Sequence, residues 1–194
     1  MTTILLARHG ETDWNRQSRW QGHADAPLND LGRQQARELA EALADEPISA
    51  IYSSDLRRAY ETARIVGDRL GCDVTAIRDL REVDVGEWSG LSVGEVHERF
   101  PLGVERWRAG GKGWEAGESY AELGARVVAA LERIADSHPD DTVLVVSHGG
   151  AIRAAMAHAR GMSYEQQRLL DPQHVTNCEV VRIASRDGEL RRLD

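Results

Sequence analysis

The sequence predicts a single α/β domain with a mostly parallel central sheet and helices on both of its faces. Continuous apolar runs at residues 4–7 and 142–146 lack the alternation of a strand that faces water on one side. Such runs are typical of strands that are covered on both faces. Segments with helical periodicity alternate with the strands along the chain, and this alternation indicates a parallel sheet with helical connections.

The expected elements follow one another in order. The predicted strands are residues 4–7, 48–53, 142–146 and 178–184, and the predicted helices are residues 36–44, 56–70, 120–134 and 151–160. Each predicted helix carries apolar residues at helical spacing, which form a stripe along one face. Asn29 can cap the first helix, Gly71 and Gly161 can end the second and fourth, and Ser119 with Glu122 forms a capping box before the third.

Composition limits the class of protein. A length of 194 residues suits one domain, 1–194, with a core of ordinary size. The net charge of −8 argues against a broad surface for nucleic acid or for an anionic membrane. The N-terminal residues resemble neither a signal peptide nor a membrane span. The two cysteines, Cys72 and Cys178, fit no metal spacing, so we expect a cytoplasmic, metal-independent protein.

Residues 86–117 interrupt the regular pattern. The segment is rich in glycine, contains Trp88, Trp107 and Trp114, and shows one short helical stretch at 93–100. An excursion of this kind can be a lid over a binding site. It can equally be an ordered surface loop whose tryptophans fill gaps, and the sequence favours neither interpretation. We describe it as a short lid-like insertion.

Two histidines follow the two strongest strands. Residues 8–10 read Arg-His-Gly and residues 147–150 read Ser-His-Gly-Gly. Ligands of open parallel sheets bind beyond the carboxyl ends of the strands, where His9 and His148 would lie. The glycines allow a ligand to approach closely, and a helix that begins at Gly149 would offer free N–H groups to an anion.

Arginines add positive charge to the same edge of the sheet. Arg8 precedes the first histidine, and a guanidinium group suits two phosphate oxygens. The stretch 53–59 begins a helix after another strand, so it can bring Arg57 or Arg58 to the same place. The remaining histidines show no comparable setting, and we expect them to be surface or core residues: His23, His97, His138, His158 and His174.

Two histidines and two arginines suit phosphoryl transfer. A neutral imidazole, with a pKa of about 6.5, can attack phosphorus, and the phosphohistidine can then be hydrolysed. The arginines and the second histidine would stabilise charge on the phosphoryl oxygens. The leaving oxygen needs a proton, so a carboxyl group is expected nearby. Glu82 is our candidate, while Asp84 and Glu87 stay open and Glu11 can serve or simply pair locally.

These motifs resemble those of the histidine phosphatase superfamily, also called the phosphoglycerate mutase-like family. Residues 8–15 are similar to the family's opening Arg-His-Gly-Glu signature, and 147–150 are similar to its second histidine motif. Three blocks between them also match in family order: residues 21–36, residues 54–63 and residues 80–90. The resemblance covers residues 4 to about 153 and implies the family's fold.

The resemblance also implies a role for each matching residue. His9 would be the phosphorylated nucleophile and Glu82 the proton donor. Further residues would bind the phosphoryl group or the substrate: Arg8, Asn15, Gln21, Gly22, Arg58, His148 and Gly149. The resemblance favours Arg58 over Arg57. It implies no metal and no organic cofactor, a small phosphorylated metabolite as partner, and it leaves a homodimer open.

The family contains phosphatases and mutases, and two features favour a phosphatase. Mutases usually carry adjacent arginines and an asparagine in a longer insertion, whereas the basic residues here are scattered: Arg99, Arg106, Arg108 and Lys112. The chain also stops soon after the last predicted strand. We therefore expect hydrolysis of phosphate monoesters of small metabolites. The alternatives are a phosphoglycerate mutase and a non-catalytic phosphate-binding module, and the presence of a proton donor argues against the module.

Overall fold

The computed structural model describes residues 1–170, 175–186 and 189–193. Within them, six strands form one mixed sheet in the order β3-β2-β4-β1-β5-β6. The first four of that order run parallel, β5 runs antiparallel to β1, and β6 runs antiparallel to β5. The strands are β1 Thr2–Arg8, β2 Ile48–Ser53, β3 Val74–Ala76, β4 Thr142–Ser147, β5 Val180–Arg186 and β6 Glu189–Arg192.

The central strands are buried on both faces, as the unbroken apolar runs predict. Leu5 and Ala7 of β1 belong to one hydrophobic cluster, whereas Ile4 and Leu6 belong to another. The residues of β4 divide between the two clusters in the same alternating way. The sheet therefore separates two cores, and each needs its own layer of helices.

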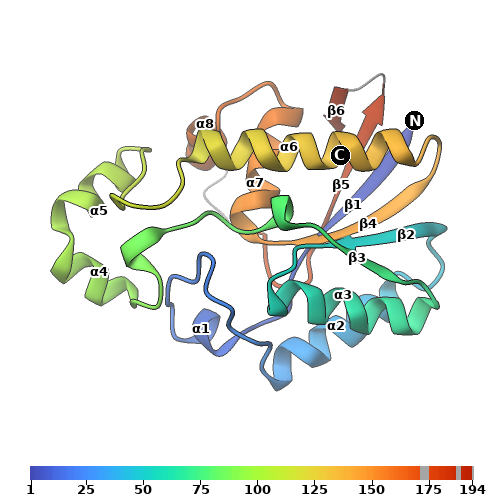
Figure 1. Ribbon diagram of the computed structural model, residues 1–194, viewed down its shortest axis with the longest axis horizontal. Helices are drawn as coiled ribbons and strands as arrows, with labels where there is room; N and C mark the ends of the chain where they lie inside the picture. Colours follow the sequence, from blue (N-terminus) through green and yellow to red (C-terminus); the bar gives the residue numbers. More distant parts are fainter. Residues whose placement is uncertain (171–174, 187–188, 194) are drawn as a thin grey trace.

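Helices supply those layers, as Figure 1 shows. Two of them cover one face of the sheet, α2 (Asp30–Ala42) and α3 (Arg57–Leu70), and two cover the other, α6 (Tyr120–Ser137) and α7 (Gly149–Ala159). The shorter helices are α1 (Asp13–Arg16), α4 (Val93–Arg99), α5 (Pro101–Arg108) and α8 (Tyr164–Leu170). Short 3₁₀ turns occur at η1 (Arg78–Leu80) and η2 (Gly86–Trp88).

The structure confirms the predicted fold class and the ends of the main helices. Asn29 caps α2, Ser119 and Glu122 form the capping box of α6, and α3 ends at Gly71. The left-handed φ of 68° at Gly71 is a conformation that glycine adopts without strain. The sequence did not predict the small elements α1, β3, α5, α8 and β6. His174 lies outside the described residues.

The segment 86–117 packs into the core that includes α6 and α7. It contains η2, α4 and α5, of which only α4 was expected. Trp88 and Trp114 are completely buried, and their rings meet edge to face with centroids 5.5 Å apart. Trp107 contacts Trp20 in the same way, at 5.4 Å. Large aromatic rings thus join the segment to the rest of the domain, and a lid motion stays a prediction.

None of the helices described is long and apolar enough to cross a membrane.

Candidate active site

The carboxyl ends of β1, β4 and β2 meet at one edge of the sheet. Arg8 lies opposite Ser147 in the β1–β4 ladder, so the next residues, His9 and His148, leave the sheet side by side. The N–H of His9 donates to the carbonyl of Ser147 at 3.0 Å, and the two imidazole centroids lie 5.2 Å apart. The parallel register therefore places both predicted histidines in one site.

His9 is held in the form that a nucleophile needs. Its Nδ1 lies 2.7 Å from the carbonyl oxygen of Gly10, which can only accept, so Nδ1 carries the proton and Nε2 carries the lone pair. Burial, with the charges of Arg58 and Arg8, lowers the pKa of His9 well below its usual 6.5. The ring is consequently neutral at neutral pH and presents Nε2 for attack.

Two guanidinium groups flank His9, that of the buried Arg58 and that of the half-buried Arg8, and backbone carbonyls hold both. Arg58 donates to the carbonyls of Ala24 and Gly22 at 2.7 and 2.9 Å, and Arg8 donates to that of Val175 at 2.7 Å. The Nε–H of each arginine is buried and has no hydrogen-bond partner among the described residues. Burial lowers the pKa of Arg58 to about 10, so the group stays charged near neutral pH. A bound anion would satisfy both unpaired donors.

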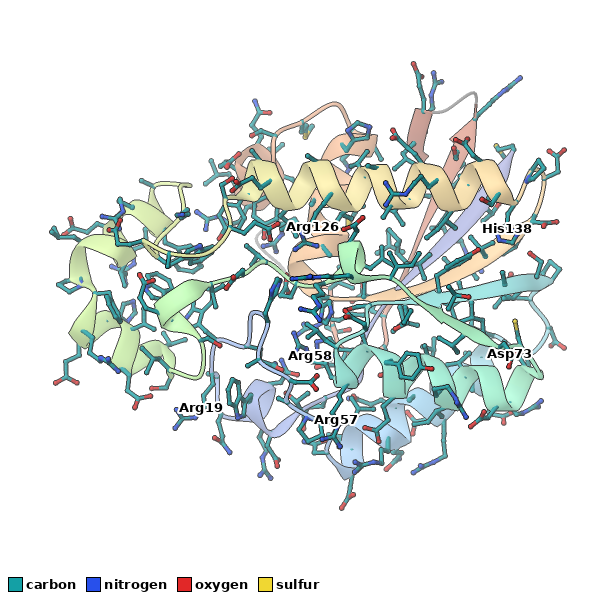
Figure 2. All side chains as sticks on the ribbon, in the orientation of Figure 1. Arg19, Arg57, Arg58, Asp73, Arg126 and His138 are labelled. Carbon is teal, nitrogen blue, oxygen red and sulfur yellow. The ribbon has the colours of Figure 1, made fainter. Side chains whose placement is uncertain are left out.

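The second predicted arginine is Arg58 and not Arg57, as the family resemblance favours. Arg58 is 1% exposed, whereas Arg57 is an exposed residue one position earlier on α3. Figure 2 shows Arg58 toward the centre of the molecule and Arg57 farther from it, below Arg58 in the view.

His148 lies completely buried behind His9 and does not line the cavity surface. Its Nε2 is 2.8 Å from the hydroxyl of Ser54, while its Nδ1 has no partner in the described part of the chain. Burial, followed by the charge of Arg58, lowers the pKa of His148 well below 6.5. A neutral ring that accepts from Ser54 at Nε2 keeps its one proton on Nδ1, which then remains available to an oxygen of a bound group.

Among the carboxyl groups that the sequence left open, only Glu82 lines the cavity with Arg8 and His9. Its two oxygens accept from the N–H groups of Val83 and Gly150, at 2.9 and 3.1 Å. The others are engaged elsewhere. Asp84 accepts from the N–H of Gly86, Glu87 accepts from the backbone of 115–116, and Glu11 accepts from the amide of Asn29.

The cavity itself has a volume of about 410 Å³. We call Arg8, His9, Arg58 and Glu82 its floor. Asn15, Gln21 and Gly22 also line it, and their contact with a substrate stays a prediction. Gly149 does not line the cavity. A Cβ added there would lie 3.8 Å from Arg8 Nε, so Gly149 packs against the Arg8 side chain.

The outer wall of the cavity consists of side chains that the sequence did not single out as site residues, although Trp107 belongs to the lid-like insertion. The outer wall is formed by Trp14, Trp107, Tyr120, Arg153, Tyr164 and Arg168. Tyr120 and Tyr164 stack with centroids 4.0 Å apart, and the guanidinium of Arg168 lies over Trp107 at 4.9 Å. These residues come from α1, α5, α6, α7 and α8. The one local signal was Arg153, an arginine in an otherwise apolar stretch of α7.

Two of the residues around the floor were also missed. His23 Nε2 donates to the carbonyl of Glu82 at 2.8 Å, so this histidine is next to the candidate acid. Arg126 of α6 donates to the same carbonyl, also at 2.8 Å. No group of three or more His, Cys, Asp or Glu side chains suited to a metal ion occurs in the described ranges.

Comparison with known proteins agrees with this geometry. Residues 4–193 match the family described as the histidine phosphatase superfamily, branch 1. The chain is 39% identical over 189 residues to phosphoglycerate mutase-like protein 4 of Arabidopsis thaliana, covering 95% of this chain and 80% of that protein. It is 41% identical over 160 residues to the metal-independent phosphoserine phosphatase of the same plant, covering 79% and 67%.

A solved structure has the same fold. The mycobacterial glucosyl-3-phosphoglycerate phosphatase matches with a TM-score of 0.88 and 33% identity, over 97% of this chain and 95% of that one. The names of the relatives are mostly those of phosphatases, with some mutase-like proteins among them. The chain belongs to the histidine phosphatase superfamily, and it is a phosphohydrolase of that family.

Proposed function

We propose that the protein hydrolyses the phosphate monoester of a small, carboxylate-bearing metabolite through a phosphohistidine at His9. The observation that carries this proposal is the state of His9. Its Nδ1–H is bonded to the carbonyl of Gly10, and its pKa is lowered, so Nε2 is an available nucleophile. Two unpaired Nε–H groups, of Arg8 and Arg58, lie beside it.

In the first step, Nε2 of His9 attacks phosphorus and the P–O bond to the alcohol breaks. Glu82 gives its proton to the leaving oxygen, so the alcohol departs neutral. Arg8, Arg58 and Nδ1–H of His148 stabilise the charge on the transferred oxygens. Asn15, Gln21 and Gly22 contact the substrate beside them.

In the second step, the Glu82 carboxylate removes a proton from a water molecule that attacks the phosphohistidine. The P–N bond breaks, its electron pair returns to Nε2, and inorganic phosphate leaves. His9 is again neutral and Glu82 is again protonated. The cycle therefore needs a single group that acts first as general acid and then as general base, and Glu82 is the one carboxyl group of the floor.

The outer wall supports a second anionic group on the substrate. Arg168 donates to the carbonyl of Trp107, and its other terminal nitrogen is buried without a partner among the described residues. Arg153 lines the same part of the cavity. Phosphoserine and glucosyl-3-phosphoglycerate, named for two of the relatives, both carry a carboxylate near the phosphate. A carboxylate on Arg168 would satisfy the unpaired donor.

Phosphoglycerate mutase is the second candidate, because some relatives bear mutase-like names. The basic residues of the insertion, however, are engaged with the insertion itself. Arg106 pairs with Glu115, Arg108 lies 3.3 Å from His97, and Lys112 approaches the carbonyl of Gly117. None of these lines the cavity. We keep the cytoplasmic location, the homodimer and the lid-like role of 86–117 as proposals.

Matched substrates test the proposal. Phosphoserine and ethanolamine phosphate differ only by the carboxylate, and 3-phosphoglycerate and glycerol 3-phosphate differ mainly in the oxidation of one carbon. Released phosphate should show kcat/KM about 10- to 100-fold higher for the carboxylated member, which is the usual worth of a hydrogen bond to a charged group. Assays with excess chelator should give the same values.

Arg168→Gln should remove most of this preference and leave p-nitrophenyl phosphate cleavage nearly unchanged. Equal rates on both members of each pair would reject the carboxylate subsite. Interconversion of phosphoglycerates without release of phosphate would instead identify a mutase.

A further inference from the structure

Every N–H donor of the Arg126 guanidinium has a hydrogen-bond acceptor, and one acceptor is the backbone carbonyl of the candidate acid, Glu82. Arg126 reaches from α6 toward the segment that follows η1, and Figure 2 shows it on the underside of that helix. One terminal nitrogen donates to the carbonyls of Asp79 and Arg81, both at 2.8 Å. The other donates to the carbonyl of Glu82 at 2.8 Å.

The two remaining donors of the guanidinium bind a single carboxylate. Glu118 accepts from Nε at 2.6 Å and from the second terminal nitrogen at 2.7 Å. The pair is largely shielded from water, with side chains 20% and 14% exposed. A guanidinium has five N–H donors, so every donor of Arg126 has an acceptor. Such a fork fixes the orientation of the group in a way that a lysine does not.

The segment that Arg126 holds has no regular structure of its own. Residues 81–85 belong to neither a helix nor a strand. The Glu82 carbonyl accepts from two side chains, Arg126 and His23. These side-chain donors hold the backbone of the loop in place, as a ladder of backbone hydrogen bonds holds a strand. They therefore hold the backbone of the residue whose carboxyl group accepts from Val83 and Gly150 beside His9.

Glu118 also connects this arrangement to the insertion. Its N–H donates to the carbonyl of Asp84 at 2.9 Å, and its carbonyl accepts from Trp114 Nε1 at 2.9 Å. Trp114 is buried in the aromatic cluster of the segment 86–117. The acid and the insertion thus share one network of contacts.

We infer that Arg126 is a positioning residue for the proton donor Glu82, oriented by Glu118 and assisted by His23. The inference rests on the proposed role of Glu82. Arg126 does not line the cavity, so it acts through the acid and does not touch the substrate. A displacement of the Glu82 carboxyl group by a fraction of an ångström weakens proton transfer without removing the group. The Arg126 network is therefore expected to affect the reaction most where the leaving group needs a proton.

The test compares kcat/KM for phosphoserine, whose alkoxide leaves poorly, with kcat/KM for p-nitrophenyl phosphate, whose phenolate leaves without a proton. Arg126→Gln should lower kcat/KM for phosphoserine about 10- to 100-fold, which is part of the rate enhancement that general acid catalysis usually gives. It should lower kcat/KM for p-nitrophenyl phosphate only a few-fold. Because kcat/KM reports steps up to enzyme phosphorylation, slow dephosphorylation does not mask the difference. For Arg126→Lys, kcat/KM for phosphoserine should lie between the values for Arg126→Gln and for the unchanged protein.

The matched control is Arg133→Gln. Arg133 is on the same helix and also binds Asp79, but through the exposed carboxylate of that residue at 2.7 Å. It should leave the ratio of the two substrates unchanged. If Arg126→Gln does not fold, Arg126→Lys and Glu118→Gln make the same comparison, since both loosen the fork and keep part of the network.

A double mutant separates this inference from the proposed function. In a Glu82→Gln background, Arg126→Gln should cause little further loss on phosphoserine, because the group that it positions is already absent. Equal losses on both substrates, or full additivity with Glu82→Gln, would assign Arg126 a purely structural role. If Glu82→Gln itself shows no dependence on the leaving group, the proposed acid is wrong, and that result is distinct from either of these.

Discussion

The floor of the cavity and its outer wall are built in different ways. Among the floor residues, Arg8 and His9 lie at the end of β1, Arg58 lies in the first turn of α3 and Glu82 follows η1. Backbone groups hold their polar atoms, as the carbonyl of Gly10 holds His9 and the N–H of Gly150 holds Glu82. The outer wall gathers single side chains from five helices, which contact one another through aromatic faces and edges. Polar contacts with a rigid sheet edge fix reacting groups closely, whereas packed aromatic rings shape a surface.

From this difference we propose that the floor carries out the chemistry and that the outer wall selects the substrate. Changes in the floor should therefore affect the reaction of every substrate, including p-nitrophenyl phosphate. Changes in the outer wall should affect some substrates and spare others. The following experiments test that division, from the largest effect to the smallest.

The largest effect is expected from His9→Ala. Without the nucleophile, turnover of all substrates should fall by on the order of 10⁴-fold or more. Circular dichroism should show an intact fold, since the variant removes one side chain. In the unchanged protein, mass spectrometry after an alkaline quench should find phosphate on His9. Phosphate on His148 instead would reverse the roles of the two histidines.

Glu82→Gln should come next, with a loss that depends on the leaving group. We expect kcat/KM for alkyl phosphates to fall about 10²- to 10⁴-fold, the usual range for general acid catalysis. Cleavage of p-nitrophenyl phosphate should fall less, because its phenolate needs no proton. Asp84→Asn and Glu87→Gln, which change carboxylates bonded outside the cavity, should have small effects. If one of them shows the leaving-group dependence instead, the acid is that residue.

Two neighbouring glycines of α7 offer a matched pair. A Cβ at Gly150 would lie 2.2 Å from Glu82 Oε1, too close for the carboxyl group to keep its place. A Cβ at Gly149 would meet nothing nearer than 3.8 Å. Gly150→Ala should therefore lower kcat/KM for alkyl phosphates about 10- to 100-fold, and Gly149→Ala only a few-fold. Similar losses in both variants would mean that the close packing of Gly150 on Glu82 is unimportant.

The last effect concerns stability, and it involves the two histidines of the site, His9 in the floor and His148 behind it. His9 and His148 have a pKa well below 6.5 in the folded state, so the unfolded chain binds more protons as the pH falls below 6.5. Folding stability should thus decrease with falling pH, by up to about 1.4 kcal/mol per pH unit for each histidine. Urea unfolding between pH 7 and pH 5 measures this slope.

Variants at the histidines show whether the slope comes from the floor. His9→Asn should reduce it, whereas the same change at His158, an exposed residue on α7, should not. A slope that is identical in all three proteins would place the pH dependence elsewhere.

Local patterns were sufficient for the large elements. The helices α2, α3 and α6 each carry an apolar stripe and a capping signal within a few residues, and these act in the isolated chain as well as in the fold. The short elements have no such signal. Among the described strands, β3 has three residues and pairs only with β2. The helix α5 begins at Pro101, and its Gly103 packs on the buried Trp88. Elements this short are stable only when packed, so their sequences say little.

The sequence by itself determined the floor. Arg8, His9 and the neighbouring His148 lie in short motifs at strand ends, and the family's motifs selected Arg58 and Glu82 among their neighbours. The carboxyl-end rule of parallel sheets is enough to bring the groups at the strand ends together. Glu82, in the irregular segment after η1, was placed by the resemblance alone.

Only the tertiary structure decided which side chains complete the site. Arg126, Arg168 and Tyr164 lie outside the motifs, and they reach the site because α6 packs on the sheet and α8 packs on α6 and α7. The lowered pKa of His9 and the unpaired Nε–H of Arg8 likewise follow from burial and from neighbours across the fold. Burial and hydrogen bonding depend on neighbours from the whole chain, and no local pattern records them.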